Sequence, residues 1–262
     1  MLQLKKGVKL QCLRLPFKKA LETAARIGAD GVEINARTEL KPAELSQTGI
    51  RHLRKMLSDL NLKVAAVHFP TRRGYDETDD LDRRLQATKD AMAMAYELGC
   101  NVVTNRIGQI VDDEESDRRS TMIQALTDLG SFSHKSGAWL ATQTGTADPK
   151  LLKQLINSLP PMAIGVDFDP AMLIINSFSA VDAMQELAEN IMHFRARDAV
   201  HDLSQGRGLE VQLGRGSVDL PALLAKMEEH QYSGYITIER DEQADVVTQC
   251  QQAVEYLDNM FS

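Results

Sequence analysis

Short apolar segments alternate with longer amphipathic segments eight times along the chain, and this alternation limits the fold more than any other feature. The expected strands cover residues 8–13, 29–35, 62–69, 101–105, 138–142, 163–169, 191–196 and 234–239. Regular strand–helix alternation implies parallel strands joined by right-handed crossovers. Eight such units in about 250 residues predict a closed (β/α)8 TIM barrel, a single domain over residues 1–262. An open doubly wound sheet is less favoured, because no G-x-G-x-x-G motif follows the first strand.

Composition narrows the class of protein and of partner. The chain has 43% hydrophobic and 26% charged residues, as ordinary globular proteins do, and a formal net charge of −7. The negative charge disfavours a nucleic-acid partner, and no apolar run is long enough to span a membrane. The N-terminus has no signal-peptide core, and Cys12, Cys100 and Cys250 are far apart and odd in number. We therefore expect buried thiols in a reducing compartment, with the cytoplasm as the default location.

Two of the expected strands end in a carboxylate. The segment 163–169 finishes at Asp169, directly before a proline, and the segment 234–239 finishes at Glu239. In a parallel barrel all strands end at the same rim, and catalytic residues lie at this carboxyl end. The two acids are therefore expected to lie at the same mouth of the barrel.

Other polar side chains follow or end the remaining strands. The candidates for substrate binding are Glu33, His68, Arg72, Arg106, His193, Arg197 and Arg215. Each alone is weak evidence, since a single histidine such as His68 or His193 is a structural residue about as often as a ligand contact. Acids and guanidinium groups converging at one end are a stronger signal, because guanidinium groups bind carboxylate or phosphate through paired hydrogen bonds. A small polyhydroxy or anionic substrate fits this rim.

A segment rich in glycine and charge, residues 198–217, is expected to be a long loop after the seventh strand. Its Gly214-Arg215-Gly216 sequence has two interpretations of equal weight. Arg215 contacts an anion, because loops after strands seven and eight often bind phosphate in barrels. Alternatively, the loop is only a tight turn before a helix capped by Ser217.

Three segments carry a resemblance to a known family. They are residues 165–170 (GVDFDP), 213–219 (LGRGSVD) and 232–239 (YSGYITIE). With them, essentially the whole chain resembles the xylose isomerase-like TIM barrels, the sugar phosphate isomerase/epimerase group that also includes metal-dependent apurinic endonucleases. The resemblance implies a sugar, sugar-acid or sugar-phosphate substrate and one divalent metal ion, Mn, Mg or Zn. The family's ligands are a Glu ending strand five, an Asp ending strand six, a His on strand seven and a Glu ending strand eight.

Two of these four ligands are changed in this chain. Asp169 and Glu239 match the second and fourth ligands, whereas Gln143 and Arg195 stand at the other two positions. An amide oxygen carries no negative charge and accepts no proton near neutral pH, and an arginine cannot bind a metal because it stays protonated. We therefore expect Arg195 to replace the metal electrostatically and to pair with Asp169 and Glu239. A shift of register by two residues, which would bring His193 to the ligand position, remains an alternative.

Three functions follow from these residues. The first is a sugar isomerase or epimerase that removes a proton next to a carbonyl group, with Glu239 as the base and with Gln143 and Arg195 in the catalytic set. The second is a non-catalytic ligand-binding barrel that has lost the metal. The third, a metal-dependent endonuclease, is disfavoured by the acidic charge and by only six histidines. The sequence leaves the oligomeric state open, a homo-oligomer included.

Overall fold

Eight parallel strands close into a barrel in the part of the chain that the computed structural model describes, residues 5–202, 207–240 and 245–261. The barrel strands are β1 (Lys5–Lys9), β2 (Gly31–Asn35), β3 (Lys63–His68), β4 (Val102–Asn105), β5 (Trp139–Gln143), β6 (Gly165–Phe168), β7 (Ile191–Ala196) and β10 (Tyr235–Ile238). Their spatial order is β1-β10-β7-β6-β5-β4-β3-β2, and β1 pairs with both β10 and β2 to close the sheet. The predicted (β/α)8 barrel is confirmed.

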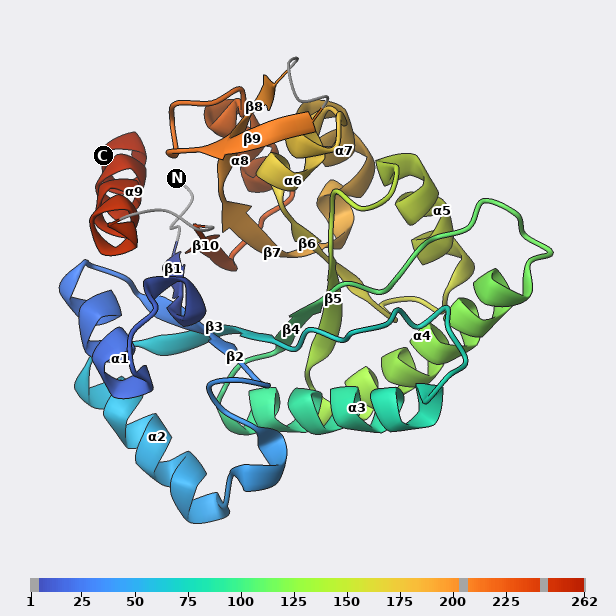
Figure 1. Cartoon of the computed structure of the whole chain (residues 1–262), viewed down its shortest axis with the longest axis horizontal. Helices are drawn as coiled ribbons and strands as arrows, with labels where there is room; N and C mark the ends of the chain where they lie inside the picture. The colour runs from blue at the N-terminus through green and yellow to red at the C-terminus, as the bar shows by residue number, and fades with distance from the viewer. Residues whose placement is uncertain (1–4, 203–206, 241–244, 262) are drawn as a thin grey trace.

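Helices surround the barrel, as Figure 1 shows. They are α1 (Phe17–Arg26), α2 (Gln47–Asp59), α3 (Leu81–Glu97), α4 (Asp117–Ser136), α5 (Pro149–Ser158), α6 (Pro170–Ile175), α7 (Ala180–Leu187), α8 (Leu220–Glu229) and α9 (Val246–Phe261). Short polar side chains begin several of them: Ser46 Oγ accepts from Gly49 N at the start of α2, and Asp219 Oδ1 accepts from Ala222 N at the start of α8. The cap of α8 is therefore Asp219 and not Ser217.

The first strand lies earlier in the sequence than expected. β1 ends at Lys9, and the apolar residues after it form a 3-10 helix, η1 (Leu10–Leu13), in which Leu10 and Leu13 are buried. Both a strand and a short helix can bury such residues, so hydrophobicity alone did not separate them. The shift matters for function, because it places Lys9 at the carboxyl end of β1.

A β-hairpin replaces the long loop expected over residues 198–217. β8 (Asp198–Asp202) and β9 (Arg207–Val211) form an antiparallel two-stranded sheet that pairs Asp198 with Val211. The hairpin lies against α6, a short helix that the sequence pattern did not indicate (Figure 1). The alternation of apolar and polar residues was obscured there by glycine and charge. The extra sheet stands at the carboxyl end of the barrel, beside the mouth.

The remaining global features agree with the composition. Cys12, Cys100 and Cys250 are free thiols, with Cys12 half-buried and the other two buried. Within the described residues, no helix has the length and apolar character needed to cross a bilayer. The predicted buried thiols are thus confirmed for Cys100 and Cys250 and only in part for Cys12.

Candidate functional site at the carboxyl ends of the strands

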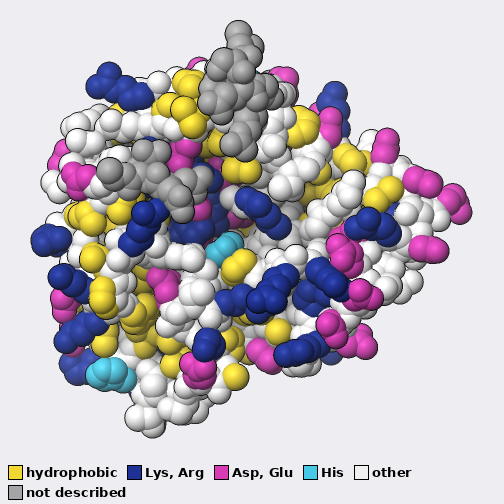
Figure 2. All heavy atoms as spheres, viewed as in Figure 1, with side chains coloured by type: hydrophobic (Ala, Val, Ile, Leu, Met, Phe, Trp, Pro, Cys, Tyr) yellow, Lys and Arg dark blue, Asp and Glu magenta, His cyan; other side chains and the backbone are white. Residues whose placement is uncertain are grey.

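A buried arginine lies at the centre of the barrel mouth. Arg195, on β7, is 1% exposed and contacts three carboxylates from three other strand ends. Its Nη2 lies 3.0 Å from Glu33 Oε2 and 2.7 Å from Asp167 Oδ2, and Nη1 pairs with Glu239. Figure 2 looks onto this mouth and shows cationic and acidic side chains together in a central hollow. The inward-facing ends of β2, β6, β7 and β10 thus form one ionic cluster.

Opposite charges in this cluster keep its members ionised despite burial. Burial opposes the charge of Glu33, but Arg195 and Lys9 outweigh it and lower the pKa of Glu33. For Asp167 burial is likewise outweighed by Arg195 and then by His193, so its pKa is lowered. Burial opposes the charge of Arg195 itself, but Asp167, Glu33 and Glu239 raise its pKa well above the ordinary value. We infer a fixed cation at the centre of the mouth at every pH where the protein is folded.

A second cation, Lys9, completes the cluster at the end of β1. Its Nζ is 2.6 Å from Glu239 Oε1 and 3.6 Å from Glu33 Oε1. Burial opposes ionisation of Glu239, but Arg195 and then Lys9 hold the pKa of this carboxyl well below its usual range. Both oxygens of Glu239 are therefore engaged by cations. The sequence analysis missed Lys9 because it expected the first strand to begin at residue 8 instead of residue 5. With the strand at its observed position, Lys9 is its last residue and would have been a candidate for the mouth.

The expected pairing of Arg195 with Asp169 is wrong, whereas the expected pairing with Glu239 is confirmed. Asp167, still inside β6, supplies the partner from this strand, with Oδ2 2.8 Å from Arg195 Nε. Asp169 lies just beyond the strand, where its Oδ1 accepts from Met172 N and caps α6. Its other oxygen is 2.9 Å from Arg197 Nη1. The alternation of side chains along the strand predicts that Asp167 and Asp169 lie on the same face. It does not predict how deep in the barrel each of them lies.

Gln143, the last residue of β5, bridges two neighbouring charged groups. Its Oε1 accepts from Arg106 Nε at 3.0 Å, and its Nε2 donates to Asp169 Oδ2 at 2.8 Å. These two contacts fix which end of the amide faces which neighbour. A glutamate in this place would bring a second carboxylate against Asp169, so the amide suits a site without a metal.

The two histidines of the mouth differ in what they leave accessible. His193 is fully buried, with Nδ1 2.8 Å from Asp167 Oδ1 and Nε2 2.8 Å from Thr237 Oγ1. Both ring nitrogens are engaged, which does not fit the alternative of His193 as a metal ligand. His68 is only half-buried, and its Nδ1 lies 3.1 Å from Thr104 Oγ1. Burial and then the charge of Lys9 lower the pKa of His68 to about 4, so its imidazole is neutral at pH 7.

The hairpin contributes a carboxylate to the outer part of the mouth. Glu210, on β9, has its Oε1 3.2 Å from Arg197 Nε and 3.2 Å from Arg240 Nη1. Arg197 therefore joins Asp169 at the end of β6 to Glu210 on the hairpin. The position of Arg197 at the mouth agrees with the sequence, and its buried ion pairs show which groups hold it there.

The Gly214-Arg215-Gly216 loop is organised around an acid of the protein itself. Asp198 Oδ2 accepts from the backbone N–H groups of Gly214 and Gly216 at 3.0 and 2.7 Å, and Oδ1 accepts from Val218 N at 3.0 Å. These donors are the groups that a bound anion would otherwise need. The backbone geometry supports the tight-turn interpretation, while Arg215 is exposed at the loop tip.

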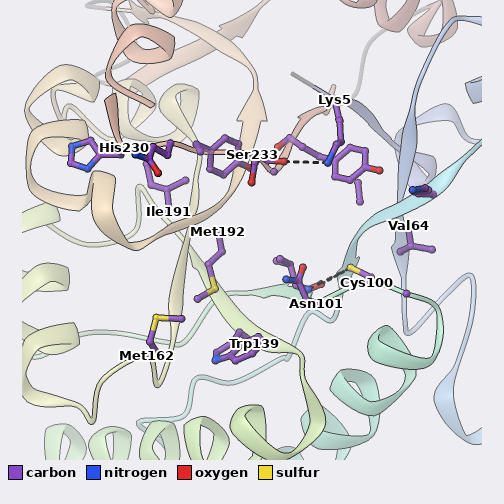
Figure 3. Close-up of a pocket in the computed structure, with 18 of the residues that line it drawn as sticks. Lys5, Val64, Cys100, Asn101, Trp139, Met162, Ile191, Met192, His230 and Ser233 are labelled. Carbon is purple, nitrogen blue, oxygen red and sulfur yellow. Dashed lines mark hydrogen bonds between the residues drawn. The ribbon is translucent and has the colours of Figure 1, made fainter. Parts of the chain in front are cut away.

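A cavity lies at the opposite end of the barrel from the Arg195 cluster. It has a volume of about 680 Å³ and is lined by residues at the amino ends of the strands, among them Lys5, Trp139 and Tyr235. Figure 3 shows Met192 and Trp139 along this cavity and the hydrogen bond from Lys5 Nζ to Ser233 O, 3.4 Å long. No member of the Arg195 cluster lines it. Since chemistry in such barrels lies at the carboxyl ends of the strands, we place the functional site at the other mouth.

The donor set at the mouth does not fit a divalent metal ion. Across the described residues, no group of three or more His, Cys, Asp or Glu side chains is arranged to hold one. Asp167 and Glu239, the acids nearest the expected position, are bound to Arg195 instead. A dication there would face the guanidinium group at close range, and this repulsion is unfavourable in a buried site. We therefore derive no chemical step through a metal.

A family model described as "Xylose isomerase-like TIM barrel" matches residues 21–260. The chain belongs to this family. A xylose isomerase domain protein from Planctomyces limnophilus superposes with a TM-score of 0.82 at 20% identity, covering 98% of this chain and 95% of that one. No curated protein sequence matches the chain.

Two further solved structures show the same xylose isomerase-like fold. A family protein from Mycobacterium smegmatis in complex with magnesium gives a TM-score of 0.78 at 15% identity, covering 99% of this chain and 96% of that one. The D-allulose 3-epimerase from Methylomonas sp. in complex with D-allulose gives 0.75 at 15% identity, covering 99% and 98%. At these identities the likeness extends to the fold alone.

Proposed function

We propose that this xylose isomerase-like barrel is a sugar isomerase or epimerase that works without a metal and uses Glu239 as its base. The observation that carries the proposal is the contact of Glu239 with two cations, Arg195 and Lys9, at the mouth. Removing a proton next to a carbonyl group puts negative charge on the carbonyl oxygen. Fixed cations aimed at that charge stabilise an enediolate as a Lewis acid would.

Substrate binding has to release part of the Glu239 carboxylate for this chemistry. In the structure Oε1 faces Lys9 and Oε2 faces Arg195. A substrate oxygen that takes over one of these contacts leaves a carboxylate oxygen open and raises the pKa of Glu239 toward its ordinary value. The open oxygen takes the proton from carbon, while the displaced cation holds the enediolate oxygen. The proton then passes from Glu239 to the former carbonyl carbon on the same face, and the neighbouring hydroxyl gives its proton to the former carbonyl oxygen, which completes an aldose–ketose isomerisation.

Gln143 restricts the reaction to one base. Its amide accepts no proton near neutral pH and is held between Arg106 and Asp169. Two-base exchange, in which acids on both faces of the substrate carbon pass the proton and invert that carbon, is therefore not proposed, and isomerisation is favoured over epimerisation. Neutral His68, on the neighbouring part of the mouth, supplies a hydrogen bond to a hydroxyl group.

Solvent exchange tests the proposal directly. Keto sugars, keto sugar acids and ketose phosphates are incubated with the protein in D2O, and deuterium at the carbon next to the carbonyl group is measured by NMR. We expect incorporation with at least one of these classes and a loss of about 100-fold or more with Glu239→Gln. No incorporation into any substrate, with Glu239→Gln indistinguishable from the wild type, would overturn the proposal.

A second function, a non-catalytic ligand-binding barrel, is supported by the same carboxylate. Burial opposes ionisation of Glu239, but Arg195 and Lys9 lower its pKa so far that it is a weak base when no substrate is bound. This function predicts tight binding of a sugar ligand without any solvent exchange. Stoichiometric Mn, Zn or Mg retained by the purified protein would contradict both the lost metal site and this second function.

A further inference from the structure

Three arginines follow three neighbouring barrel strands on one side of the mouth. Arg37 comes just after β2, Arg72 after β3 and Arg106 directly after β4, and these strands are adjacent in the barrel. All three side chains belong to exposed residues, and none forms an ion pair with a carboxylate in the described parts of the chain. Figure 2 shows Lys and Arg side chains gathered along one side of the hollow. We call these three residues the open arginines.

Two of the open arginines are held by one edge of the guanidinium group. Arg106 Nε donates to Gln143 Oε1 at 3.0 Å, and Arg37 Nε donates to the carbonyl oxygen of Pro70. The guanidinium carbon of Arg37 also lies 4.4 Å above the centre of the Phe69 ring. In both residues the terminal Nη groups are left for another acceptor. A guanidinium held in this way loses less conformational entropy when it binds an oxyanion through two parallel hydrogen bonds.

Two of the open arginines, Arg37 and Arg72, also repel each other. Partial burial and the nearby positive charge of Arg72 lower the pKa of Arg37. Like charges that face one another without a counter-ion cost free energy, and an anion bound between them relieves that cost. By contrast Arg73 and Arg118, in the same part of the chain, are paired with Asp79 and Asp76. The open arginines therefore lie at the mouth without a carboxylate partner among the described residues, although some exposed arginines elsewhere, such as Arg54 on α2, also have none.

We propose that the open arginines bind an oxyanionic group of the substrate, a carboxylate or a phosphate monoester, and so select a sugar acid or sugar phosphate over a neutral sugar. This inference rests on the proposed function, since it names the substrate class for the same mouth. Gln143 connects the two parts: its amide holds Arg106 on one side and Asp169 on the other. The oxyanion lies over β2–β4, and the hydroxyl and carbonyl groups reach toward Lys9 and Glu239.

The other arginines of the mouth do not offer this subsite. Arg195 is bound to three acids, and Arg197 and Arg240 both contact Glu210. Their Nη groups already have carboxylate partners. An incoming oxyanion would therefore have to compete with a carboxylate that the protein itself holds in place. The open arginines face no such competition in the described structure.

Three matched probes test the inference by calorimetry at fixed, low ionic strength: D-fructose, D-fructose 6-phosphate and D-fructuronate. We expect at least one charged probe to bind about tenfold or more tightly than D-fructose. Arg106→Gln and Arg37→Gln should each weaken binding of the charged probe about tenfold, and Arg37→Gln, which does not touch Gln143, should leave D-fructose binding unchanged. Arg54→Gln, at an exposed site on α2, is the matched control and should change neither. Which charged probe binds distinguishes phosphate from carboxylate.

Two results would overturn the inference. One is failure of both charged probes to bind more tightly than D-fructose, and the other is tight binding that Arg106→Gln and Arg37→Gln leave unchanged. The solvent-exchange experiment separates this failure from that of the proposed function. If deuterium exchanges into neutral ketoses and the charged probes bind no more tightly than D-fructose, only the proposed oxyanion subsite is wrong. If a charged probe binds in a way that depends on the open arginines but no deuterium is exchanged, only the proposed catalytic function is wrong.

Discussion

The two sides of the barrel mouth use the same residue type in opposite ways. On the side of β6, β7 and β10, Arg195 and Arg197 are 1% and 2% exposed and paired with carboxylates. On the side of β2, β3 and β4, the open arginines Arg37, Arg72 and Arg106 are exposed, and the described residues give them no carboxylate partner. One side is a cluster of paired charges, and the other is a positive rim without acid partners in the described residues.

The difference shows how burial decides what a charge can do. A buried guanidinium has lost its hydration and is tolerated only with several well-placed acids, so Arg195 is committed to Glu33, Asp167 and Glu239. An exposed guanidinium keeps its hydration and costs little, so it stays available for a ligand. In the proposed function, the paired side fixes the electric field at the reacting centre, and the open side selects the substrate.

The largest expected effect is on the paired side. Arg195→Met leaves three carboxylates buried without their shared cation, which should lower the free energy of unfolding by about 3–5 kcal/mol at pH 7. Urea unfolding followed by circular dichroism measures it. The matched control is Arg54→Met on α2, where we expect a change within about 0.5 kcal/mol.

The pH dependence of that variant gives a second readout. In the wild type the lowered pKa values of Glu33, Asp167 and Glu239 give stability that is present above their unfolded values and lost as the pH falls through the folded values. Without Arg195, burial raises these pKa values instead, so the variant should regain stability as the pH falls from 7 to 5. A loss below about 1 kcal/mol, or the same pH slope as the wild type, would show that the cluster does not depend on Arg195.

His68, at the end of β3 on the open side, should dominate the acid response near pH 5. Its folded pKa of about 4 lies below the unfolded value of about 6.5, so the unfolded chain takes up the proton first. The stability from neutral His68 is therefore full above pH 6.5 and lost as the pH falls to 4, by about 3 kcal/mol. His68→Gln removes this component, so its unfolding free energy should fall less than that of the wild type over the same range. Parallel curves for the two proteins would contradict the lowered pKa.

The paired side should accept a metal once its cation is removed. In Gln143→Glu/Arg195→His, Asp167 and Glu239 lose their guanidinium partner, and a glutamate and a histidine become available as ligands. We expect Mn2+ affinity to rise about tenfold or more over the wild type, with a metal-dependent rise in Tm. Elemental analysis after dialysis and calorimetry measure it. Gln143→Glu alone keeps Arg195 and should gain nothing; a gain in this single variant would show that Arg195 does not block the site.

The smallest effect is expected on the open side. Arg106→Met removes an exposed charge that has no acid partner in the described structure, so the free energy of unfolding should change by about 0.5 kcal/mol or less. The same urea experiment as for Arg195→Met measures it. A loss comparable to that of Arg195→Met would mean that Arg106 is a structural residue, and the contrast between the two sides would be wrong.

Sequence periodicity was sufficient for the barrel because eight strand–helix units leave few other topologies. It was also sufficient for placing Glu239 and Arg195 at one mouth, since parallel strands end at one rim. Periodicity was insufficient for the position of a side chain along a strand. Asp167 and Asp169 share a face, and only the length of β6 decides which of them reaches the centre of the mouth. Lys9 was lost to an error of the same kind at β1.

The hydrogen-bond and ion-pair partners of individual side chains were harder to predict from the sequence. Asp198 accepts from backbone groups of Gly214 and Gly216, and nothing in the residue types distinguishes this from a loop that binds an external anion. Glu210 reaches Arg197 only because residues 198–211 form a hairpin rather than a loop. Such contacts depend on side-chain direction and on register, which alternation patterns constrain only loosely.

The Arg195 cluster also sets an order of events during synthesis. Its members are residues 9, 33, 167, 195 and 239, and the last of them belongs to the end of the strand that closes the barrel against β1. A nascent chain that has not yet emerged past residue 239 holds Arg195 with two acids and leaves Lys9 without its nearest one. The mouth therefore has its full set of ion pairs only after the last barrel strand has been synthesised, and a polypeptide that terminates before residue 239 cannot assemble the site.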